Sequence, residues 1–123
     1  MFHRIRSHHD FMWSYTRALL VALRRPIFVF LTFIAATVCL LMTALFFFAE
    51  RGVNPLVQQP FDAFYFVVTT MTSVGYGDIV PATISGKFIS MLTMVLGTGI
   101  YVTFTAVLAT VLIQLEGGKG GRD

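Results

Sequence analysis

The sequence predicts an all-α membrane protein in which two helices cross the bilayer, and a short helix and a loop between them enter it without crossing. Three observations favour this fold class. Of the 123 residues, 56% are hydrophobic and only 12% are charged, against roughly 25% charged in soluble domains. Two apolar runs, 27–49 and 85–114, are long enough to span a bilayer. The apolar run between them, 61–71, is too short to span it.

The first apolar run, 27–49, predicts a helix about 34 Å long, enough to cross a hydrocarbon core of about 30 Å. Pro26 suits the first turn of this helix, and Glu50, Arg51 and Gly52 are expected to end it at the interface. The second run, 85–114, is longer and should tilt or project beyond the membrane.

Two further segments flank this membrane domain of residues 26–115. Residues 1–25 are expected to be cytoplasmic, with 11–25 forming an interfacial helix along the inner leaflet. A plain extension of the first spanning helix is the alternative for that stretch. The glycine-rich residues 116–123 should form a flexible cytoplasmic tail.

The charge pattern predicts the orientation in the membrane. Most cations precede the first apolar run or follow the last one: Arg4, Arg6, Arg17, Arg24, Arg25, Lys119 and Arg122. By the positive-inside rule both termini are then cytoplasmic. We therefore expect a multi-pass protein of the cell (inner) membrane, with residues 50–84 facing outward.

The central stretch is the most informative part of the sequence. Pro60 and Asp62 are helix-start signals for the helix at 61–71, and TSVGYGD follows at 72–78. Irregular backbone is tolerated at membrane depth only where protein encloses it or where it lines a water-filled path. Gly75 and Gly77 permit positive φ angles, so that successive carbonyls can point to one side. A permeating cation would then supply the partners that these carbonyls need.

Four copies of the loop around an axis would offer about eight oxygens to one ion between two levels, which replaces its shell of water. The pattern therefore implies a homotetramer around a central pore. SVGYGD after an apolar helix resembles the potassium-channel pore family, and the resemblance extends over about residues 26–115. It implies an outer helix, a re-entrant pore helix, a selectivity-filter loop and an inner helix. It also implies K⁺ as the permeant ion, held only at the filter, with no organic cofactor.

The resemblance assigns a role to each residue of the central stretch. The ion would be bound by Ser73, through its side chain and carbonyl, and by the carbonyls of Val74, Gly75 and Tyr76. Residues expected to support the filter are Tyr65, Phe66, Thr69, Thr70, Thr72, Gly77 and Asp78. We expect Thr70 to reach Tyr76, Tyr65 to reach Asp78, and Thr72 to end the pore helix. Asp78 either concentrates cations at the outer mouth or makes a local hydrogen bond.

Three positions depart from the family pattern. Ser73 replaces a threonine and lacks the methyl group that restrains its rotamer, so the innermost ion site should be weaker. Thr69 stands where well-known bacterial members have a carboxylate that braces the filter, and Phe66 stands in place of a tryptophan. We expect selectivity to be kept, and filter stability and inactivation to differ.

The inner helix carries the expected gate. Gly97 matches the family's gating-hinge glycine, with Gly99 close by; tight packing of the small residues 97–99 is the alternative. Candidates for the cavity or the constriction are Thr105, Ala109 and Ile113, with the bulky Phe104 beside them.

The sequence therefore predicts a potassium-selective channel that conducts passively and is gated by its inner helices. No nucleophile–base pair or metal-ligand cluster is apparent, so enzyme activity is not expected. A weakly selective cation channel and the excised pore of a longer ligand-gated potassium channel remain alternatives. The expected partners are other copies of the chain, membrane lipid, and a regulatory domain that is either C-terminal or separate; no nucleic acid is expected.

Overall fold

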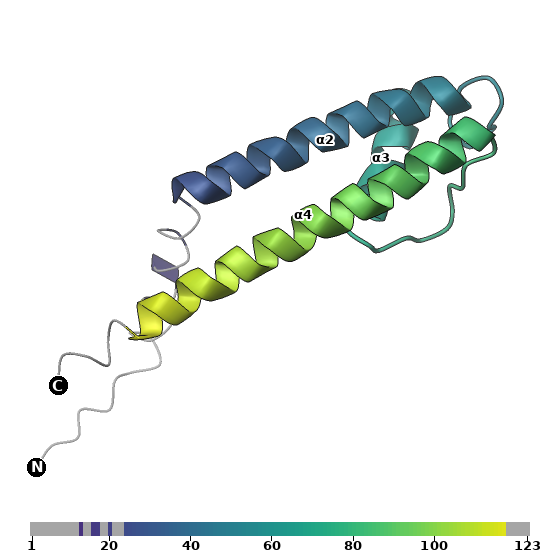
Figure 1. Ribbon diagram of the computed structural model, residues 1–123. Coiled ribbons are helices and arrows are strands. Elements are labelled where there is room, and N and C mark those ends of the chain that lie inside the picture. The colour runs from purple at the N-terminus through teal and green to yellow at the C-terminus, as the bar shows by residue number, and fades with distance from the viewer. Residues whose placement is uncertain (1–12, 14–15, 18–19, 21–23, 118–123) are drawn as a thin grey trace, which may run out of the picture.

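The structure, a computed structural model, describes residues 13, 16, 17, 20 and 24–117, with side chains to residue 114. Three helices fill most of this part of the chain: α2 (Pro26–Glu50), α3 (Pro60–Met71) and α4 (Ile84–Gly117). Figure 1 shows α2 and α4 running along each other, with α3 tucked between them at the end where α2 stops and α4 starts. Most of the expected interfacial helix 11–25, and the tail from residue 118, lie outside the described residues.

The expected all-α fold is confirmed, since the described residues contain no strand. The predicted helical ranges 27–49, 61–71 and 85–114 lie within α2, α3 and α4, and α4 continues three residues further, to Gly117. Both α2 and α4 are long and apolar enough to cross a membrane, by length and composition. With about 1.5 Å per residue they are about 38 and about 51 Å long.

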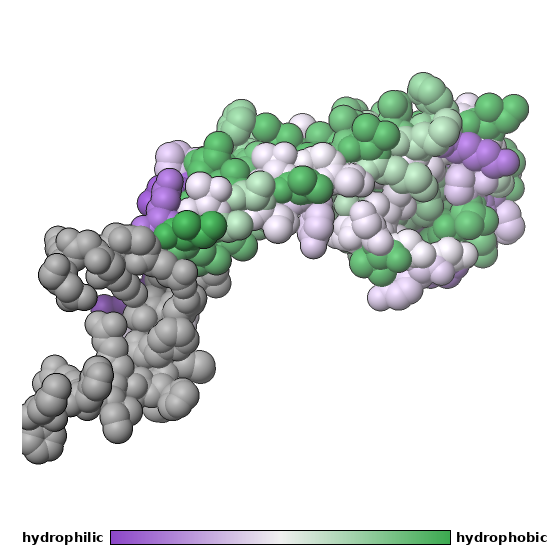
Figure 2. Space-filling view, turned by 60° about the horizontal axis from the view of Figure 1, so that its bottom comes forward, coloured by the Kyte–Doolittle hydropathy of each residue, from purple (hydrophilic) through white to green (hydrophobic). Residues whose placement is uncertain are grey.

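The surface of the two long helices suits a lipid environment. Large apolar side chains such as Phe33, Leu40 and Val95 are exposed along them, and hydrophobic residues dominate the view in Figure 2. Seven hydroxyl groups in the described parts of these helices donate to the carbonyl four residues earlier; the pairs include Thr37 with Phe33 and Thr103 with Gly99. Such internal bonds remove the cost of a polar group in hydrocarbon.

The short helix α3 begins with a capping box. Asp62 Oδ2 accepts the N–H of Gln59 at 2.9 Å, the Asp62 N–H donates to the Gln59 carbonyl at 3.0 Å, and Pro60 occupies the first turn. The buried side of α3 packs against α2 through a cluster of Met42, Phe46, Val57, Ala63, Phe66, Val67 and Met71. Within it, the Phe46 and Phe66 rings are stacked with centroids 4.1 Å apart. This packing fixes α3 at one end of the helical pair.

A second, smaller cluster joins α2 and α4 at their opposite ends. Phe28 and Val111 are buried there, with Phe104, Val107 and Leu108 against them. The Phe28 and Phe104 rings meet edge to face, 5.1 Å between centroids. The two long helices are therefore packed together on both sides of their midpoint.

A buried carboxylate joins the end of α2 to the start of α4. Glu50 is 0% exposed. One of its oxygens, Oε2, accepts bonds from Asn54 Nδ2 (2.6 Å) and the Ala82 N–H (2.8 Å). The other, Oε1, accepts bonds from the N–H and the hydroxyl of Thr83, at 2.9 and 2.6 Å. Four donors on two oxygens favour the ionised form and offset the cost of its burial.

Neighbouring groups extend this network. Asn54 Nδ2 also donates to the carbonyl of Val80, 2.8 Å away, and the Thr83 hydroxyl accepts the Gly86 N–H at 2.8 Å. A Cβ atom on Gly86 would collide with the Glu50 carboxylate, so glycine is the residue that fits this position. The network thus fixes the path of residues 80–86, through which the chain enters α4.

Replacing Glu50 with glutamine should destabilise the protein. The glutamine amide places a donor group where the carboxylate accepts two bonds, so at least one of the four buried donors loses its partner, at about 1–3 kcal/mol. Thermal unfolding in mild detergent measures the effect. Lys87→Gln is the matched control, because it removes an exposed charge on the first turn of α4. Equal stability of the two variants would contradict the role given to Glu50.

Candidate ion-conduction site

The loop between α3 and α4, residues 72–83, has an alternating backbone. Ser73, Gly75 and Gly77 have φ angles of 60°, 53° and 76°, whereas no other non-glycine residue among those described has a positive φ. From residue 73 to residue 77, every second residue therefore has a positive φ angle, whereas Val74 and Tyr76 between them do not. Positive φ at alternate residues is the condition under which successive carbonyls can point to one side. The positive φ angles predicted for Gly75 and Gly77 are confirmed.

The N–H groups at the start of the loop are used by the end of α3. Ser73 donates to the carbonyl of Thr70 at 3.1 Å, and both Val74 and Gly75 donate to the carbonyl of Thr69 at 3.0 Å. These carbonyls belong to the last turn of the helix, which has no partners of its own. The loop therefore starts as a cap on α3, with its donors turned toward the helix.

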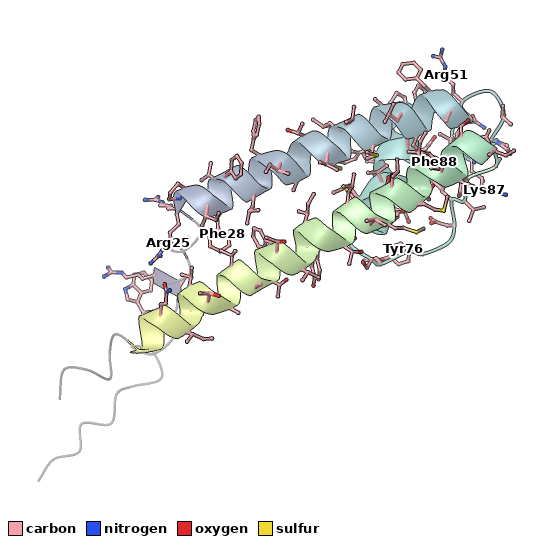
Figure 3. The ribbon with its side chains drawn as sticks, in the orientation of Figure 1. Arg25, Phe28, Arg51, Tyr76, Lys87 and Phe88 are labelled. Carbon is pink, nitrogen blue, oxygen red and sulfur yellow. The ribbon has the colours of Figure 1, made fainter. Side chains whose placement is uncertain are left out.

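The carbonyls of Ser73, Val74, Gly75 and Tyr76 accept no hydrogen bond from any described residue. Their side chains leave this segment open, since Val74 is 53% and Tyr76 71% exposed, and Tyr76 projects outward from the loop (Figure 3). A row of acceptors without donors, in a chain of lipid-crossing helices, requires an outside partner. Water or a cation fits these oxygens.

One side-chain bond holds the outer part of the loop to α3. The Tyr65 hydroxyl donates to Asp78 Oδ2 at 2.8 Å, as expected from the sequence. Asp78 Oδ1 accepts the N–H of Ile79 at 3.1 Å, so both carboxylate oxygens make local bonds. The bond to Asp78 raises the pKa of Tyr65 above its usual value, with smaller contributions from desolvation and from the Asp78 charge.

The other expected supporting residues take different positions. Thr69 supports the loop through its carbonyl, while its hydroxyl bonds the carbonyl of Phe66. No hydrogen bond joins Thr70 to Tyr76 within the described chain. Thr72 caps α3 as predicted, with its hydroxyl 2.7 Å from the Val68 carbonyl.

Behind the loop lies a cavity of about 220 Å³. Its lining comes from α3, the loop and α4: Phe66, Thr69, Thr70, Gly75, Gly77, Ile79, Val80, Pro81, Ser90 and Met94. In the single chain, the loop is therefore joined to α3 and to Glu50 by hydrogen bonds and has open space behind it.

The glycines of α4 differ in their surroundings. Gly97 is buried, and a Cβ atom added there would lie 2.6 Å from Met71 Cα at the end of α3. Gly99 has nothing within 4 Å of the same position. In this structure Gly97 lets α4 approach α3, which is the packing role that the sequence left as an alternative to a hinge.

The expected cavity and constriction residues are not all brought together. Thr105, Ala109 and Ile113 are exposed on the single chain, and the Thr105 hydroxyl bonds the carbonyl of Tyr101. Phe104 instead packs on Phe28 of α2. Its ring therefore faces the other long helix and does not lie with the other three.

Glu50, Asn54 and Thr83 are important residues that the sequence pattern does not single out. From sequence, Glu50 is expected only to end a helix at the interface. An available signal is the ionisable residue at the end of an apolar span with an asparagine four residues later, because ionisable groups at membrane depth generally have a specific partner.

Comparison with known proteins identifies the family. Residues 27–114 match a family model described as ion channel. This chain belongs to that ion-channel family. A channel family agrees with the expectation that the chain is not an enzyme.

Two relatives of this channel chain carry more specific names. It is 49% identical over 53 residues to the hyperpolarization-activated voltage-gated potassium channel of Methanocaldococcus jannaschii, covering 43% of this chain and 25% of the relative. It is 37% identical over 95 residues to the calcium-gated potassium channel TvoK of Thermoplasma volcanium, covering 76% of this chain and 27% of the relative. The chain thus spans about a quarter of the length of these relatives.

The Tyr65–Asp78 bond predicts that Tyr65 loses its proton at a higher pH than an ordinary tyrosine. Because the pKa of Tyr65 is raised, its bond contributes stability fully below the ordinary tyrosine pKa of about 10, and loses it as pH rises through the raised value. An ultraviolet titration of tyrosinate should show one late step that disappears in Tyr65→Phe and moves to lower pH in Asp78→Asn. Tyr101→Phe, a control on α4, should leave the late step in place. A late step that survives Tyr65→Phe would refute the assignment.

Gly97 and Gly99 should respond differently to alanine. Gly97→Ala forces α4 and Met71 apart and should lower stability by about 1–3 kcal/mol. Gly99→Ala meets open space in the chain and should gain up to about 1 kcal/mol from helix propensity. Thermal unfolding and single-channel recording of both variants separate packing from hinging. Unchanged stability with a lower open probability in Gly97→Ala would favour the hinge.

Proposed function

We propose that this chain conducts K⁺ passively across the cell membrane as a homotetramer, with residues 72–78 as its selectivity filter. The observation that carries the proposal is the alternating backbone at Ser73, Gly75 and Gly77, together with the four carbonyls that accept no bond from the described residues. These carbonyls and the Ser73 hydroxyl are the proposed K⁺ ligands.

Four chains are needed because one chain offers too few oxygens. An ion that leaves water must find a full shell of ligands, and a single strand supplies one or two at each level. A fourfold arrangement supplies about eight between two adjacent levels. The end of α3 points its last turn at the start of the loop, and the negative end of that helix favours a cation below the filter.

The names of the relatives support K⁺ as the permeant ion, because both are called potassium channels. The 95-residue match to the calcium-gated relative covers most of this chain. A regulatory domain, part of a longer chain or separate, is therefore included in the proposal. Both termini are assigned to the cytoplasm from the excess of Arg and Lys outside residues 26–115.

The proposed gate lies on α4. Thr105, Ala109 and Ile113 are exposed on the single chain, which makes them available to face a central axis in the tetramer. Phe104 is left out of this set because it packs on Phe28. The second, smaller cluster, which includes Phe28, Phe104 and Val111, would have to repack if the cytoplasmic half of α4 moved away from α2.

Purified protein in liposomes tests the function under opposed K⁺ and Na⁺ gradients. The proposal expects K⁺ flux well above Na⁺ flux, and a tetramer by size in mild detergent. Equal K⁺ and Na⁺ flux would favour the weakly selective cation channel instead. A monomer or dimer with no flux would refute the pore.

A glycine pair sharpens this test. Gly77 and Gly52 have similar positive φ angles, 76° and 79°, and at neither position would an added Cβ atom meet another atom within 4 Å. Substitution by alanine should therefore lower the free energy of unfolding by a similar amount, roughly 1–2 kcal/mol, at either site. Gly77→Ala should abolish K⁺ flux or its selectivity, because the carbonyls turn, whereas Gly52→Ala should keep both. Equal loss in both variants would point to instability and not to the filter.

A further inference from the structure

A group of cationic and aromatic side chains lies at the end of the molecule where α2 begins. We call it the arginine–tryptophan surface; it comprises Trp13, Arg17, Arg24 and Arg25. Trp13 is 63% exposed, and the Arg17 guanidinium carbon lies 5.4 Å from the centre of its ring. The three arginines are exposed as well. Figure 3 shows Arg25 at this end of the helical pair, with Arg51 and Lys87 at the other end.

The charges of this surface have no ionic partner in the described part of the chain. The carboxylates described there belong to Glu50, Asp62 and Asp78, and all three bond groups around the far end of α2. Arg25 precedes Pro26 with extended backbone angles, φ −65° and ψ 140°, and its side chain makes no cap on α2. The guanidinium groups thus remain available to an anion.

Apolar surface begins directly beside these charges. Ile27 and Phe30 are 44% and 60% exposed on the first turns of α2. A phospholipid has the same succession of groups, a phosphate followed within a few ångströms by acyl chains. Arginine binds phosphate through two parallel hydrogen bonds, and tryptophan favours the boundary between headgroups and acyl chains.

We propose that the arginine–tryptophan surface binds the headgroup of an anionic phospholipid in the leaflet where α2 begins. The proposal rests on the membrane insertion proposed above, which makes this the cytoplasmic leaflet. Arg24 and Arg25, which directly precede α2, hold the phosphate, and Arg17 with Trp13 adds a further cation and an aromatic ring at the same end of the molecule. A cationic segment next to a membrane gains affinity with each arginine when the leaflet is anionic.

Trp13 is the only tryptophan of the chain, so its fluorescence reports on this surface alone. The full-length protein is reconstituted in mixtures of phosphatidylglycerol and phosphatidylcholine, with bromine on the acyl chains of one lipid at a time. Brominated chains quench tryptophan on contact. The proposal expects brominated phosphatidylglycerol to quench at a lower mole fraction than brominated phosphatidylcholine, with a preference that weakens as salt is added. Equal quenching by the two lipids, or by neither, would overturn it.

Charge variants test which residues carry the preference. The double variant Arg24→Gln, Arg25→Gln should reduce the phosphatidylglycerol preference by roughly fivefold for each arginine removed. Arg51→Gln with Lys87→Gln removes the same charge at the other end and should leave the preference unchanged. Arg24→Lys with Arg25→Lys keeps the charge and should retain most of the preference. A double glutamine variant with unaltered preference would refute the assignment.

Potassium flux measured in the same vesicles separates the two proposals. Flux with no lipid preference would reject the lipid site and leave the channel function standing. A lipid preference without flux would reject the channel function and leave the lipid site standing.

Discussion

The buried Glu50 carboxylate is the interaction on which the outer end of the molecule depends. Its two oxygens receive four hydrogen bonds, one from Asn54 beyond α2 and three from Ala82 and Thr83 before α4. Ala82 and Thr83 are 32 and 33 residues from Glu50 in the chain, and neither is part of a helix that packing alone would align. The carboxylate therefore fixes the position at which the chain enters α4 after the loop.

The loop of residues 72–83 is held at both ends, and this limits the hydrogen bonds that its central residues can make. At its start the loop is held by N–H groups that donate to Thr69 and Thr70, and at its end by Glu50. Between these anchors Tyr65 adds one bond, to Asp78. The N–H groups of residues 73–75 are thus used by α3, whereas the carbonyls of residues 73–76 accept no bond from the described residues. These unpaired carbonyls are the oxygens that we propose as K⁺ ligands, and the proposed site needs no charged side chain.

The helices are well predicted from the sequence because their signals are local. An apolar run long enough for a bilayer, a proline in the first turn and an Asp at the third position identify α2 and α3 without knowledge of the rest of the chain. Gly75 and Gly77 likewise indicate positive φ by their residue type. Contacts between distant segments carry no such signal: Glu50 looks like an interfacial charge until Ala82 is placed beside it. Thr69 is hard to predict for a related reason, since its carbonyl holds the loop and its side chain does not.

Gly97 shows how one residue type serves two physical purposes. A glycine in the middle of a spanning helix permits both bending and close approach, and the sequence cannot separate them. In this conformation, the short distance from the Cβ position of Gly97 to Met71 Cα shows that the glycine permits the close approach of α4 to α3. Met71 is two residues from Ser73, so this close approach lies beside the start of the loop.

Ser73 combines two opposing effects at that start. Serine lacks the methyl group of threonine, so its hydroxyl is less restrained, and the proposed innermost ion site is expected to be weaker. Its backbone, however, has a φ of 60°, a conformation that is most unfavourable for β-branched residues. Serine therefore relieves backbone strain at the same position where it loosens the side chain. In the proposed filter the Ser73 hydroxyl is therefore held less firmly than a threonine hydroxyl would be, whereas the backbone that carries the Ser73 carbonyl is less strained.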